Sequence, residues 1–426
     1  MKTVLILGAG STAKLGAPTT NAQIGLFEKI GESSDDPALL VRLKEICNKK
    51  FGVAKKKEGD EESYPFSVND IFNLLDSNLL LHNGIYTEHV KLDVFELEQC
   101  KRELIAFLFR SFQRNIRGRD RALYEQYVNF YAELARREIR RKKSMFGEHT
   151  PARDAFIASY SVVNFNWDLY SLLPIIEAHS RVNRSGANYL PFARNPQLRI
   201  FTDFQCEYGG RGDDKLWYPF TESAAFQVNS EKHDSLRRVI TVKCIYPHGG
   251  MNLFKCPGCS KHSYFLGDLT IDSVNDALEF KKDSRDTYKC PYCGHRIGGF
   301  DFDILPQSNF KVRNSFLEET RLSMISEVQN ADRLVFIGYS MPEDDVDFRT
   351  LFKGLCTKKK DIFVLLKGDA DSGNAFVSFE ELCPRDKQRD EVRRFQDTFG
   401  HPGANHQLFF NMSGAPEAFR TVVDIV

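Results

Sequence analysis

The sequence lacks a net charge, a long apolar stretch and an internal repeat, and each absence excludes a class of protein. Its 58 Lys and Arg residues balance 58 Asp and Glu residues, so no global field draws the molecule onto nucleic acid or a membrane. No stretch approaches the roughly 20 apolar residues that a membrane span requires. With 42% hydrophobic and 27% charged residues and no extended low-complexity segment, the composition is that of a soluble globular protein.

The N-terminus also lacks the features of an export signal. One Lys precedes a short apolar run, and Gly8-Ala9-Gly10 ends that run too early for a signal peptide. We therefore expect a cytoplasmic protein whose ten cysteines are reduced, because disulfides persist mainly in oxidising compartments. Clustered cysteines in such a protein indicate metal binding.

Short apolar runs predict an α/β fold. Four runs have the composition of buried parallel strands: residues 4–7, 161–165, 334–337 and 362–366. The segment between the first two has apolar residues at helical spacing and is too long for a simple crossover. We expect a doubly wound, mostly parallel, Rossmann-like sheet formed by residues 1–21 and 151–426, with a helical insertion at 22–150. Residues 181–235 show no clear period, and no role is assigned to them.

A glycine turn follows the first predicted strand. Residues 8–13, Gly-Ala-Gly-Ser-Thr-Ala, fit the G-x-G-x-x-G/A pattern, in which backbone amides approach a pyrophosphate at a helix N-terminus. A P-loop is excluded because Lys14 lacks the preceding Gly and the following Ser or Thr. A simple dinucleotide dehydrogenase is disfavoured because the chain turns helical where a second strand with an acidic end is required. A tight turn without a ligand is the open alternative.

Four cysteines form two C-P-x-C knuckles separated by 30 residues. Each knuckle directs two thiolates to one point, and two knuckles complete the closed tetrahedral shell that structural zinc prefers. A closed shell has no position for water, so the predicted zinc supports folding and is not a Lewis acid. We expect a small zinc-ribbon module at about residues 250–300, and a redox dithiol is the alternative. The predicted ligands are Cys256, Cys259, Cys290 and Cys293.

The order of the motifs resembles the sirtuin family. That family has G-A-G-x-S with G-I-P, then T-Q-N-x-D, then H-G before a four-cysteine zinc ribbon, and finally G-T-S at a late strand. The matching segments here are Gly8-Ala9-Gly10 with Gly16-Ala17-Pro18, Asn166-Trp167-Asp168, His248-Gly249 before the knuckles, and Gly338-Tyr339-Ser340. The resemblance implies an NAD site on a sirtuin-type doubly wound sheet that carries a helical module and a zinc module.

The resemblance also implies roles for individual residues. Asp168 would bind the carboxamide of nicotinamide, and Asn166 would orient water or a ribose hydroxyl. His248 titrates near neutrality and could accept a proton from a ribose hydroxyl or from the attacking water. As alternatives, Asn166 caps a following helix and His248 is a histidine satisfied beside a turn. Residues implied in the cofactor pocket are Gly8, Ala9, Gly10, Thr12 and Pro18, with Gly338 and Ser340 at the phosphate or ribose side.

The departures from the family pattern change the expected reaction. Deacylating sirtuins follow G-I-P with D-F-R, whose Phe shields the reaction centre, whereas Thr19-Thr20-Asn21 follows Pro18 here. Phe165 replaces the Gln before the motif Asn, and residues 303–306 lack the F-G-E that helps hold an acyl-lysine peptide. The chain looks more like the bacterial sirtuin-like NAD hydrolases of antiphage defence, many of which deplete cellular NAD. We predict hydrolysis of NAD to nicotinamide and ADP-ribose.

Three alternatives to this reaction stay open: an NAD-dependent protein deacylase, an ADP-ribosyltransferase and a non-catalytic nucleotide-sensing or scaffold subunit. Hydrolysis itself expels neutral nicotinamide from a cationic ring, so the site needs oxocarbenium stabilisation and a placed nucleophile, and no acid for the leaving group. That requirement explains the absence of a paired set of carboxylates.

A basic run ends one predicted helix and raises the question of a partner. A solvated helix end that complements the macrodipole explains the run, and contact with nucleic acid or an acidic protein is the alternative. The resemblance to defence proteins implies a homo-oligomer and a second protein, such as a DNA-translocating ATPase or an Argonaute, although no motif identifies the partner. The run comprises Arg136, Arg137, Arg140, Arg141, Lys142 and Lys143.

Overall fold

A computed structural model gives the arrangement of the chain. It describes residues 1–17, 20–32, 36–53, 55–56, 62–63, 65–116, 121–145, 153–168, 170–185, 197–209, 237–265, 290–295, 302–304, 314–342, 345–355, 359–368, 374–400 and 406–426.

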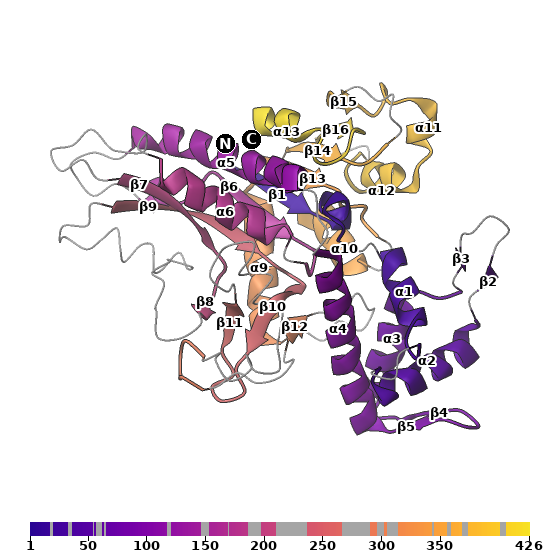
Figure 1. Ribbon diagram of the computed structural model, residues 1–426. Helices are drawn as coiled ribbons and strands as arrows, with labels where there is room; N and C mark the ends of the chain where they lie inside the picture. The colour runs from indigo at the N-terminus through magenta and orange to yellow at the C-terminus, as the bar shows by residue number, and fades with distance from the viewer. Residues whose placement is uncertain are drawn as a thin grey trace.

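An eight-stranded sheet forms the centre of the molecule (Figure 1). Its strand order is β15-β16-β14-β13-β1-β6-β9-β7, and every pairing is parallel except that of β15 with β16. The strands are β1 (Thr3–Leu7), β6 (Tyr160–Asn164), β7 (Gln197–Asp203), β9 (Arg237–Ile245), β13 (Arg333–Ile337), β14 (Asp361–Leu365), β15 (Val377–Ser378) and β16 (Gln407–Asn411). The predicted α/β class with a mostly parallel sheet is confirmed.

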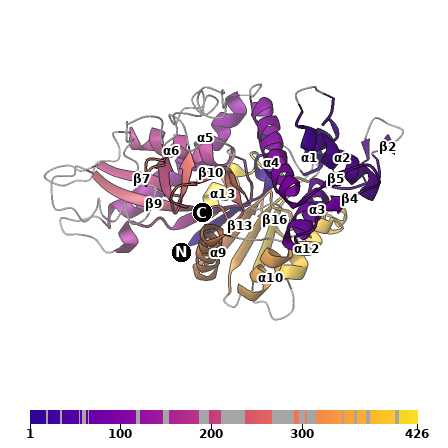
Figure 2. The same ribbon diagram turned by 90° about the horizontal axis from the view of Figure 1, so that it is seen from below.

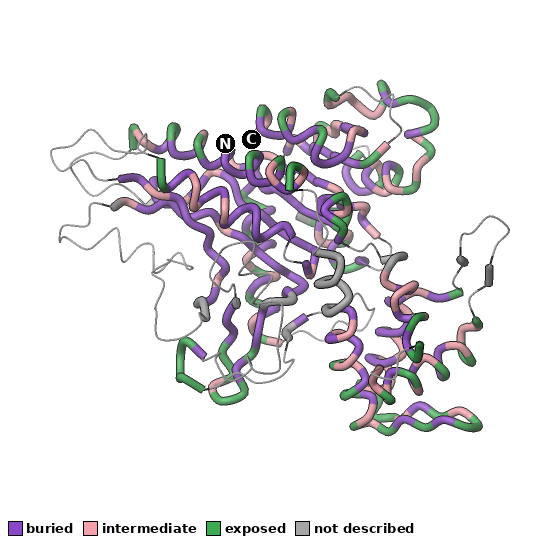
Figure 3. Tube along the Cα trace, in the orientation of Figure 1, coloured by how far each residue is buried: buried purple, intermediate pink, exposed green. Residues whose placement is uncertain are grey.

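The central strands are apolar because both of their faces are covered. All five residues of β1 and all five of β6 are buried, as expected for strands with helices on both sides. The four apolar runs of the sequence coincide with β1, β6, β13 and β14 to within one residue at either end. Figure 3 shows the buried positions continuing through this part of the sheet.

Alternation along β1 divides the core into two layers. Leu5 and Leu7 face one cluster and Val4 and Ile6 face the other, because successive side chains of a strand point to opposite faces. The first layer contains α5 (Arg121–Lys143), α6 (Leu172–Asn183) and α13 (Phe419–Ile425), and the second contains α9 (Ser315–Asn330), α10 (Val346–Leu355) and α12 (Asp390–Phe399). Figure 2 shows these helices on opposite sides of the sheet.

The helices between β1 and β6 occupy two places. The first four form a lobe beside the sheet together with two short hairpins (Figure 1), whereas α5 packs along α6 on the sheet. The lobe comprises α1 (Thr20–Glu28), α2 (Ala38–Phe51), β2 (Lys55–Lys56), β3 (Glu62–Ser63), α3 (Val68–Leu80), β4 (Ile85–Tyr86), β5 (Lys91–Leu92) and α4 (Val94–Ile116). The insertion boundaries at residues 22 and 150 stay a prediction.

A second, four-stranded sheet has the order β12-β10-β11-β8. Its strands are β8 (Glu207–Gly209), β10 (Gly249–Lys255), β11 (His262–Phe265) and β12 (Phe302–Ile304). β9 of the main sheet and β10 of this sheet are joined by one tight turn, so the two sheets meet at that turn. Of the stretch 181–235, residues 186–196 and 210–235 lie outside the described residues.

The remaining described elements are short: α11 (Pro384–Lys387) and three 3-10 helices, η1 (Ala9–Ser11), η2 (Ala13–Leu15) and η3 (Arg153–Ala155). Among the described residues, every helix is too short or too polar to serve as a membrane span.

Candidate active site and metal centre

The predicted site motifs follow four neighbouring strands of the main sheet. In the order β13-β1-β6-β9, the strands are parallel, so their carboxyl ends lie along one edge. The chain continues from β1 to β6 on one side, and it later reaches β13 on the other side of β1. This change of direction is a topological switch point, where open α/β sheets bind their ligands. The Gly8 turn and the Gly338 turn lie on the two sides of the switch point.

The glycines of these two turns allow backbone to touch backbone. A Cβ on Gly8 would lie 2.4 Å from Cα of Tyr339, and a Cβ on Gly338, where φ is +61°, would lie 2.1 Å from the nitrogen of Ser11. The N–H of Gly10 donates to the carbonyl of Gly338 at 2.9 Å. Close packing of the two turns therefore explains glycine at these positions. The amides of Gly8, Gly10 and Ser11 all donate within the protein, and their predicted role toward a pyrophosphate stays a prediction.

Asn166 and Asp168 are tied to the glycine turn by hydrogen bonds. Asn166 Nδ2 donates to the carbonyl of Gly8 at 3.0 Å and lies 3.5 Å from Thr12 Oγ1. Thr12 Oγ1 donates to Asp168 Oδ2 at 3.1 Å, and Asp168 Oδ1 accepts the N–H of Tyr170 at 2.8 Å. All of these polar side chains are buried. The structure thus brings Gly8, Thr12, Asn166 and Asp168 together.

Asn164, which the sequence reasoning missed, shapes this loop. Its Oδ1 accepts the N–H of Asn166 at 3.1 Å, and its Nδ2 donates to Ser171 Oγ at 2.6 Å. The first bond is an Asx turn, by which asparagine ends a strand and redirects the chain. Two asparagines two residues apart after a buried strand are the signal that could have identified it. Asn166 does not cap α6, whose N-cap residue is Ser171.

The segment between Asn166 and Asp168 also contacts the helical lobe. The ring of Trp167 meets the ring of Phe72 in α3 edge to face, with centroids 6.3 Å apart. The lobe is therefore packed directly against the site loop.

A tight turn presents His248. The N–H of Gly249 donates to the carbonyl of Tyr246 at 2.9 Å, and Gly249 has φ of +69°. Pro247 occupies the second position of this four-residue turn, where its fixed φ is favourable, and glycine is preferred at the fourth. The H-G motif is thus a turn whose third residue is the histidine.

His248 is completely buried at this edge. Its Nδ1 lies 3.3 Å from the carbonyl of Phe165, and its Nε2 lies 3.7 Å from Oδ1 of Asp345. Asp345 Oδ2 accepts a hydrogen bond from the Tyr339 hydroxyl at 2.9 Å. The rings of Phe165 and Phe348 contact the imidazole at centroid distances of 5.3 and 5.1 Å. Asp345 was not among the predicted site residues, because nothing in its neighbourhood in the sequence marks it as a partner of His248.

The three remaining predicted site residues are Ala9, Ser340 and Pro18. Ala9 begins η1 within the same turn, and the carbonyl of Ser340 accepts from Arg394 Nε at 3.1 Å. Pro18 lies outside the described residues.

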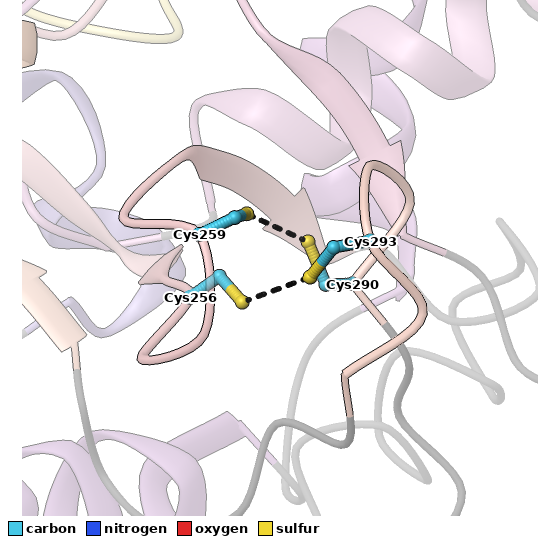
Figure 4. A group of neighbouring side chains, drawn as sticks. All are labelled: Cys256, Cys259, Cys290 and Cys293. Atoms are coloured by element: carbon cyan, nitrogen blue, oxygen red, sulfur yellow. Dashed lines mark hydrogen bonds between the residues drawn. The ribbon is translucent and has the colours of Figure 1, made fainter.

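The four predicted zinc ligands form one cluster (Figure 4). Their sulfur atoms all lie within 4.8 Å of one another, and the Cys256–Cys293 and Cys259–Cys290 sulfur distances are 3.7 and 3.6 Å. Tetrahedral zinc with Zn–S bonds of about 2.3 Å separates its sulfurs by about 3.8 Å. The chemistry and the spacing of these donors therefore fit a four-thiolate zinc ion.

The two knuckles have matching backbone geometry. In the first, the N–H of Ser260 donates to the carbonyl of Cys256 at 2.8 Å, and in the second the N–H of Gly294 donates to that of Cys290 at 2.9 Å. Ser260 and Gly294 both have left-handed backbones, with φ of 59° and 71°. Between the knuckles, Lys261 Nζ lies 4.5 Å from the centre of the Tyr292 ring.

The thiols of the cluster ionise unequally without a cation. Burial opposes ionisation of Cys256, but hydrogen bonds from the backbone N–H groups of Cys259 and Gly258 and from the thiols of Cys290 and Cys293 together bring the pKa of Cys256 down to about 7. Burial raises the pKa of Cys290 to about 12. A bound cation removes this penalty because the thiolate is the metal-binding form.

The basic run at the end of α5 is partly paired with carboxylates of α5 and α13. Glu133 forms ion pairs with Arg136, Arg137 and Arg140 at 3.4, 3.6 and 3.0 Å. Arg141 pairs with Glu138. These contacts favour the solvated helix end over a nucleic-acid surface.

Comparison with known proteins gives a distant structural similarity to Sir2 enzymes. No family model matches the sequence, and no curated protein matches it. A structure described as "Structural Basis for the Mechanism and Regulation of Sir2 Enzymes" is 13% identical with a TM-score of 0.35, over 99% of this chain and 90% of that chain. Sir2Tm bound to a propionylated peptide is 12% identical with a TM-score of 0.32, over 100% and 92%. TM-scores of this size do not establish a common fold.

Proposed function

We propose that this protein hydrolyses NAD to nicotinamide and ADP-ribose at the carboxyl edge of its main sheet. The observation that carries the proposal is the convergence of Asn166, Asp168 and His248 beside the switch point between β1 and β13. These residues come from two separate loops, and the carbonyl of Phe165, next to Asn166, links them through its contact with His248.

Each residue has a task that suits its surroundings. Asp168 is oriented by Thr12 and by the N–H of Tyr170, and a carboxylate held in this way can accept the carboxamide N–H of nicotinamide. Asn166 supplies an amide beside the glycine turn that can orient the attacking water. His248 accepts the proton of that water as the new C–O bond forms, and nicotinamide leaves as a neutral molecule.

The surroundings of His248 favour hydrolysis over deacylation. Phe165 occupies the position where deacylating sirtuins have Gln, and its ring stacks on Tyr339 at 4.8 Å as well as contacting His248. An aromatic residue here fills space with apolar surface and offers no amide to a peptide substrate. The missing D-F-R after Pro18 points in the same direction.

The four-cysteine cluster has a structural task in this proposal. A zinc ion held by Cys256, Cys259, Cys290 and Cys293 has no open coordination position, so it would fix the end of β10 and take no part in the reaction. Because β10 begins directly after His248, the ion would steady the turn that carries the histidine.

The experiment is to incubate the purified protein with NAD and to follow nicotinamide and ADP-ribose by chromatography, with and without an acyl-lysine peptide. Equal release of both products without peptide is expected. His248→Ala should lower the rate at least about 100-fold, the usual contribution of a general base. His179→Gln, which changes another buried histidine away from this edge, is the matched control and should retain activity.

Other products would contradict the proposal in different ways. Release of nicotinamide that requires the peptide and yields acylated ADP-ribose would establish a deacylase. Full activity of Asn166→Ala would show that the amide has no part in the reaction.

A role as an antiphage NAD-depleting effector, with a homo-oligomeric state and a partner such as a DNA-translocating ATPase or an Argonaute, is supported only by the motif resemblance. Light scattering of the purified chain tests the oligomeric state. Loss of cellular NAD during phage infection, abolished by His248→Ala, tests the role.

A further inference from the structure

We propose that Asp345 is the positioning residue for His248, and that Tyr339 holds Asp345 in place. This inference rests on the proposed NAD hydrolysis. Asp345 immediately precedes α10 and is completely buried, as is His248. The carboxylate lies between the two side chains, with Oδ1 3.7 Å from His248 Nε2 and Oδ2 2.9 Å from the Tyr339 hydroxyl that donates to it.

A carboxylate is costly to bury unless it is hydrogen-bonded and faces a positive charge. The Tyr339 hydroxyl satisfies the first condition. The second condition, a facing positive charge, is met once His248 has accepted a proton, because the resulting imidazolium lies opposite Oδ1. The rings of Phe165 and Phe348 contact the imidazole, and both His248 and Asp345 are buried, an environment that strengthens an interaction between charges.

The other nitrogen of His248 fixes which tautomer is present. Nδ1 faces the carbonyl of Phe165 at 3.3 Å, and a carbonyl can only accept, so Nδ1 carries a hydrogen. In the neutral ring, Nε2 therefore has no hydrogen and is the nitrogen that can accept a proton. It is also the nitrogen that faces Asp345. The carbonyl of Phe165 therefore orients the ring through Nδ1, and the ring acts as a base through Nε2, the nitrogen that Asp345 faces.

The proton balance of the step is simple. The O–H bond of the attacking water breaks as its proton passes to Nε2, its oxygen forms the bond to the ribose carbon, and the glycosidic electron pair leaves with nicotinamide. Asp345 stays ionised throughout. It stabilises the imidazolium that forms and holds the ring plane, with its Oδ1 3.7 Å from the nitrogen that receives the proton.

Tyr339 is the residue by which this chain departs from the G-T-S motif. The tyrosine hydroxyl stands a full ring away from the backbone and reaches across to Asp345, while its ring stacks on Phe165. The departure from the motif therefore coincides with the partner that fixes the carboxylate.

The test compares four proteins: the wild type, Asp345→Asn, Tyr339→Phe and Asp347→Asn. Asp347 is an exposed carboxylate in the first turn of the same helix, so its variant is the matched control. Asp345→Asn should lower kcat for NAD about 10- to 100-fold, as loss of an orienting partner usually does, with KM within about twofold. Tyr339→Phe should give a smaller loss of the same kind, and Asp347→Asn no change.

A second measurement is independent of turnover. In protein labelled with ¹⁵N-histidine, the His248 Nε2 signal, assigned by its loss in His248→Gln, should shift toward the value of an unprotonated nitrogen in Asp345→Asn at a fixed pH. Asp347→Asn should leave the signal unchanged. Tyr339→Phe provides the same information if Asp345→Asn does not fold.

The two proposals fail differently. If the wild type does not cleave NAD, the proposed function fails, while the nitrogen signal still decides whether Asp345 acts on His248. If the wild type cleaves NAD and both Asp345→Asn and Tyr339→Phe match it in kcat and in the nitrogen signal, the assignment of Asp345 is wrong.

Discussion

Two histidines on opposite sides of the main sheet are equally buried and differ in what faces them. His179 in α6 is 1% exposed, and its Nδ1 lies 3.0 Å from the Thr202 hydroxyl. His248 is 0% exposed, and it faces a carbonyl and the carboxylate of Asp345. Burial lowers the pKa of His179 to about 3, so that histidine is a neutral packing residue at ordinary pH.

The difference teaches that burial alone does not identify a functional histidine. A neutral hydroxyl leaves the imidazole uncharged, whereas a carboxylate provides a place for its positive charge. The histidine on the α6 side of the sheet is therefore a packing residue, whereas the histidine on the side of α10 and β10 has a partner for a positive charge.

Loss of the metal should have the largest effect, and it should affect β10 and β11 but not the α6 side of the sheet. Cys290→Ser removes one of four thiolates, and a structural zinc ion is worth about 10 kcal/mol or more to the fold that it holds. We expect zinc content to fall from about one ion per chain, and amide protection to disappear from β10 and β11 while α5 and α6 keep theirs. Metal analysis and hydrogen exchange measure these outcomes.

Cys383→Ser is the control for the metal experiment. Cys383 is exposed, lies outside the cluster, and caps α11 by accepting the N–H of Asp386, which serine can also do. Full zinc content in Cys290→Ser would contradict the assignment of that ligand.

Gly338→Ala should disrupt the contact between the Gly8 turn and the Gly338 turn. The added methyl would overlap the Ser11 nitrogen, and φ of +61° is unfavourable for alanine. We expect a loss of about 3 kcal/mol in the free energy of unfolding, measured by urea denaturation. Gly354→Ala in α10 is the control, because its added Cβ meets nothing within 4 Å, and it should be neutral or slightly stabilising. Equal stabilities of the two variants would remove the packing explanation for Gly338.

The pH dependence of stability should report the neutral state of His179. Its pKa is about 3 in the folded protein and near 6.5 when unfolded, so the unfolded chain binds more protons between these values. Stability from this residue is complete above pH 6.5 and is lost as pH falls, by about 1.4 kcal/mol per pH unit. His179→Gln should remove this part of the slope, and an unchanged slope between pH 6.5 and 5 would contradict burial as the cause.

The smallest effect is expected for Glu133→Gln in α5, on the α6 side of the sheet. Its ion pairs with three arginines lie on the surface of α5, and exposed pairs contribute roughly 0.5 kcal/mol or less each. Thermal denaturation should therefore change little. The wild type should show no affinity for duplex DNA at physiological salt, and salt-dependent binding would restore the nucleic-acid interpretation of the basic run.

The metal centre and the central strands were predictable because their signals are local. Cys256 and Cys259 lie within one knuckle, whose spacing is itself the ligand geometry. Strands buried on both faces, such as β1 and β13, are continuous apolar runs. In each case a few neighbouring residues contain the whole pattern.

The partners within the candidate site were not predictable because they are fixed by contacts between distant segments. Asp345 meets His248 across nearly 100 residues of sequence. Asn164 lay within the predicted strand at residues 161–165, and its role depends on the bond to Ser171. Gly8 and Gly338 were assigned to a cofactor, whereas the approach of their two backbones already requires glycine at both positions.

The position of β1 in the sheet has a consequence for synthesis. This strand is synthesised well before its two neighbours in the sheet, which are residues 160–164 and 333–337. Closing such long loops is slow, because their entropy is lost before the pairings stabilise the chain. A nascent chain that ends before β13 exposes one full edge of β1 and lacks the Gly338 turn altogether. The carboxyl edge that holds the candidate site can therefore assemble only after β13 and the Gly338 turn have been made.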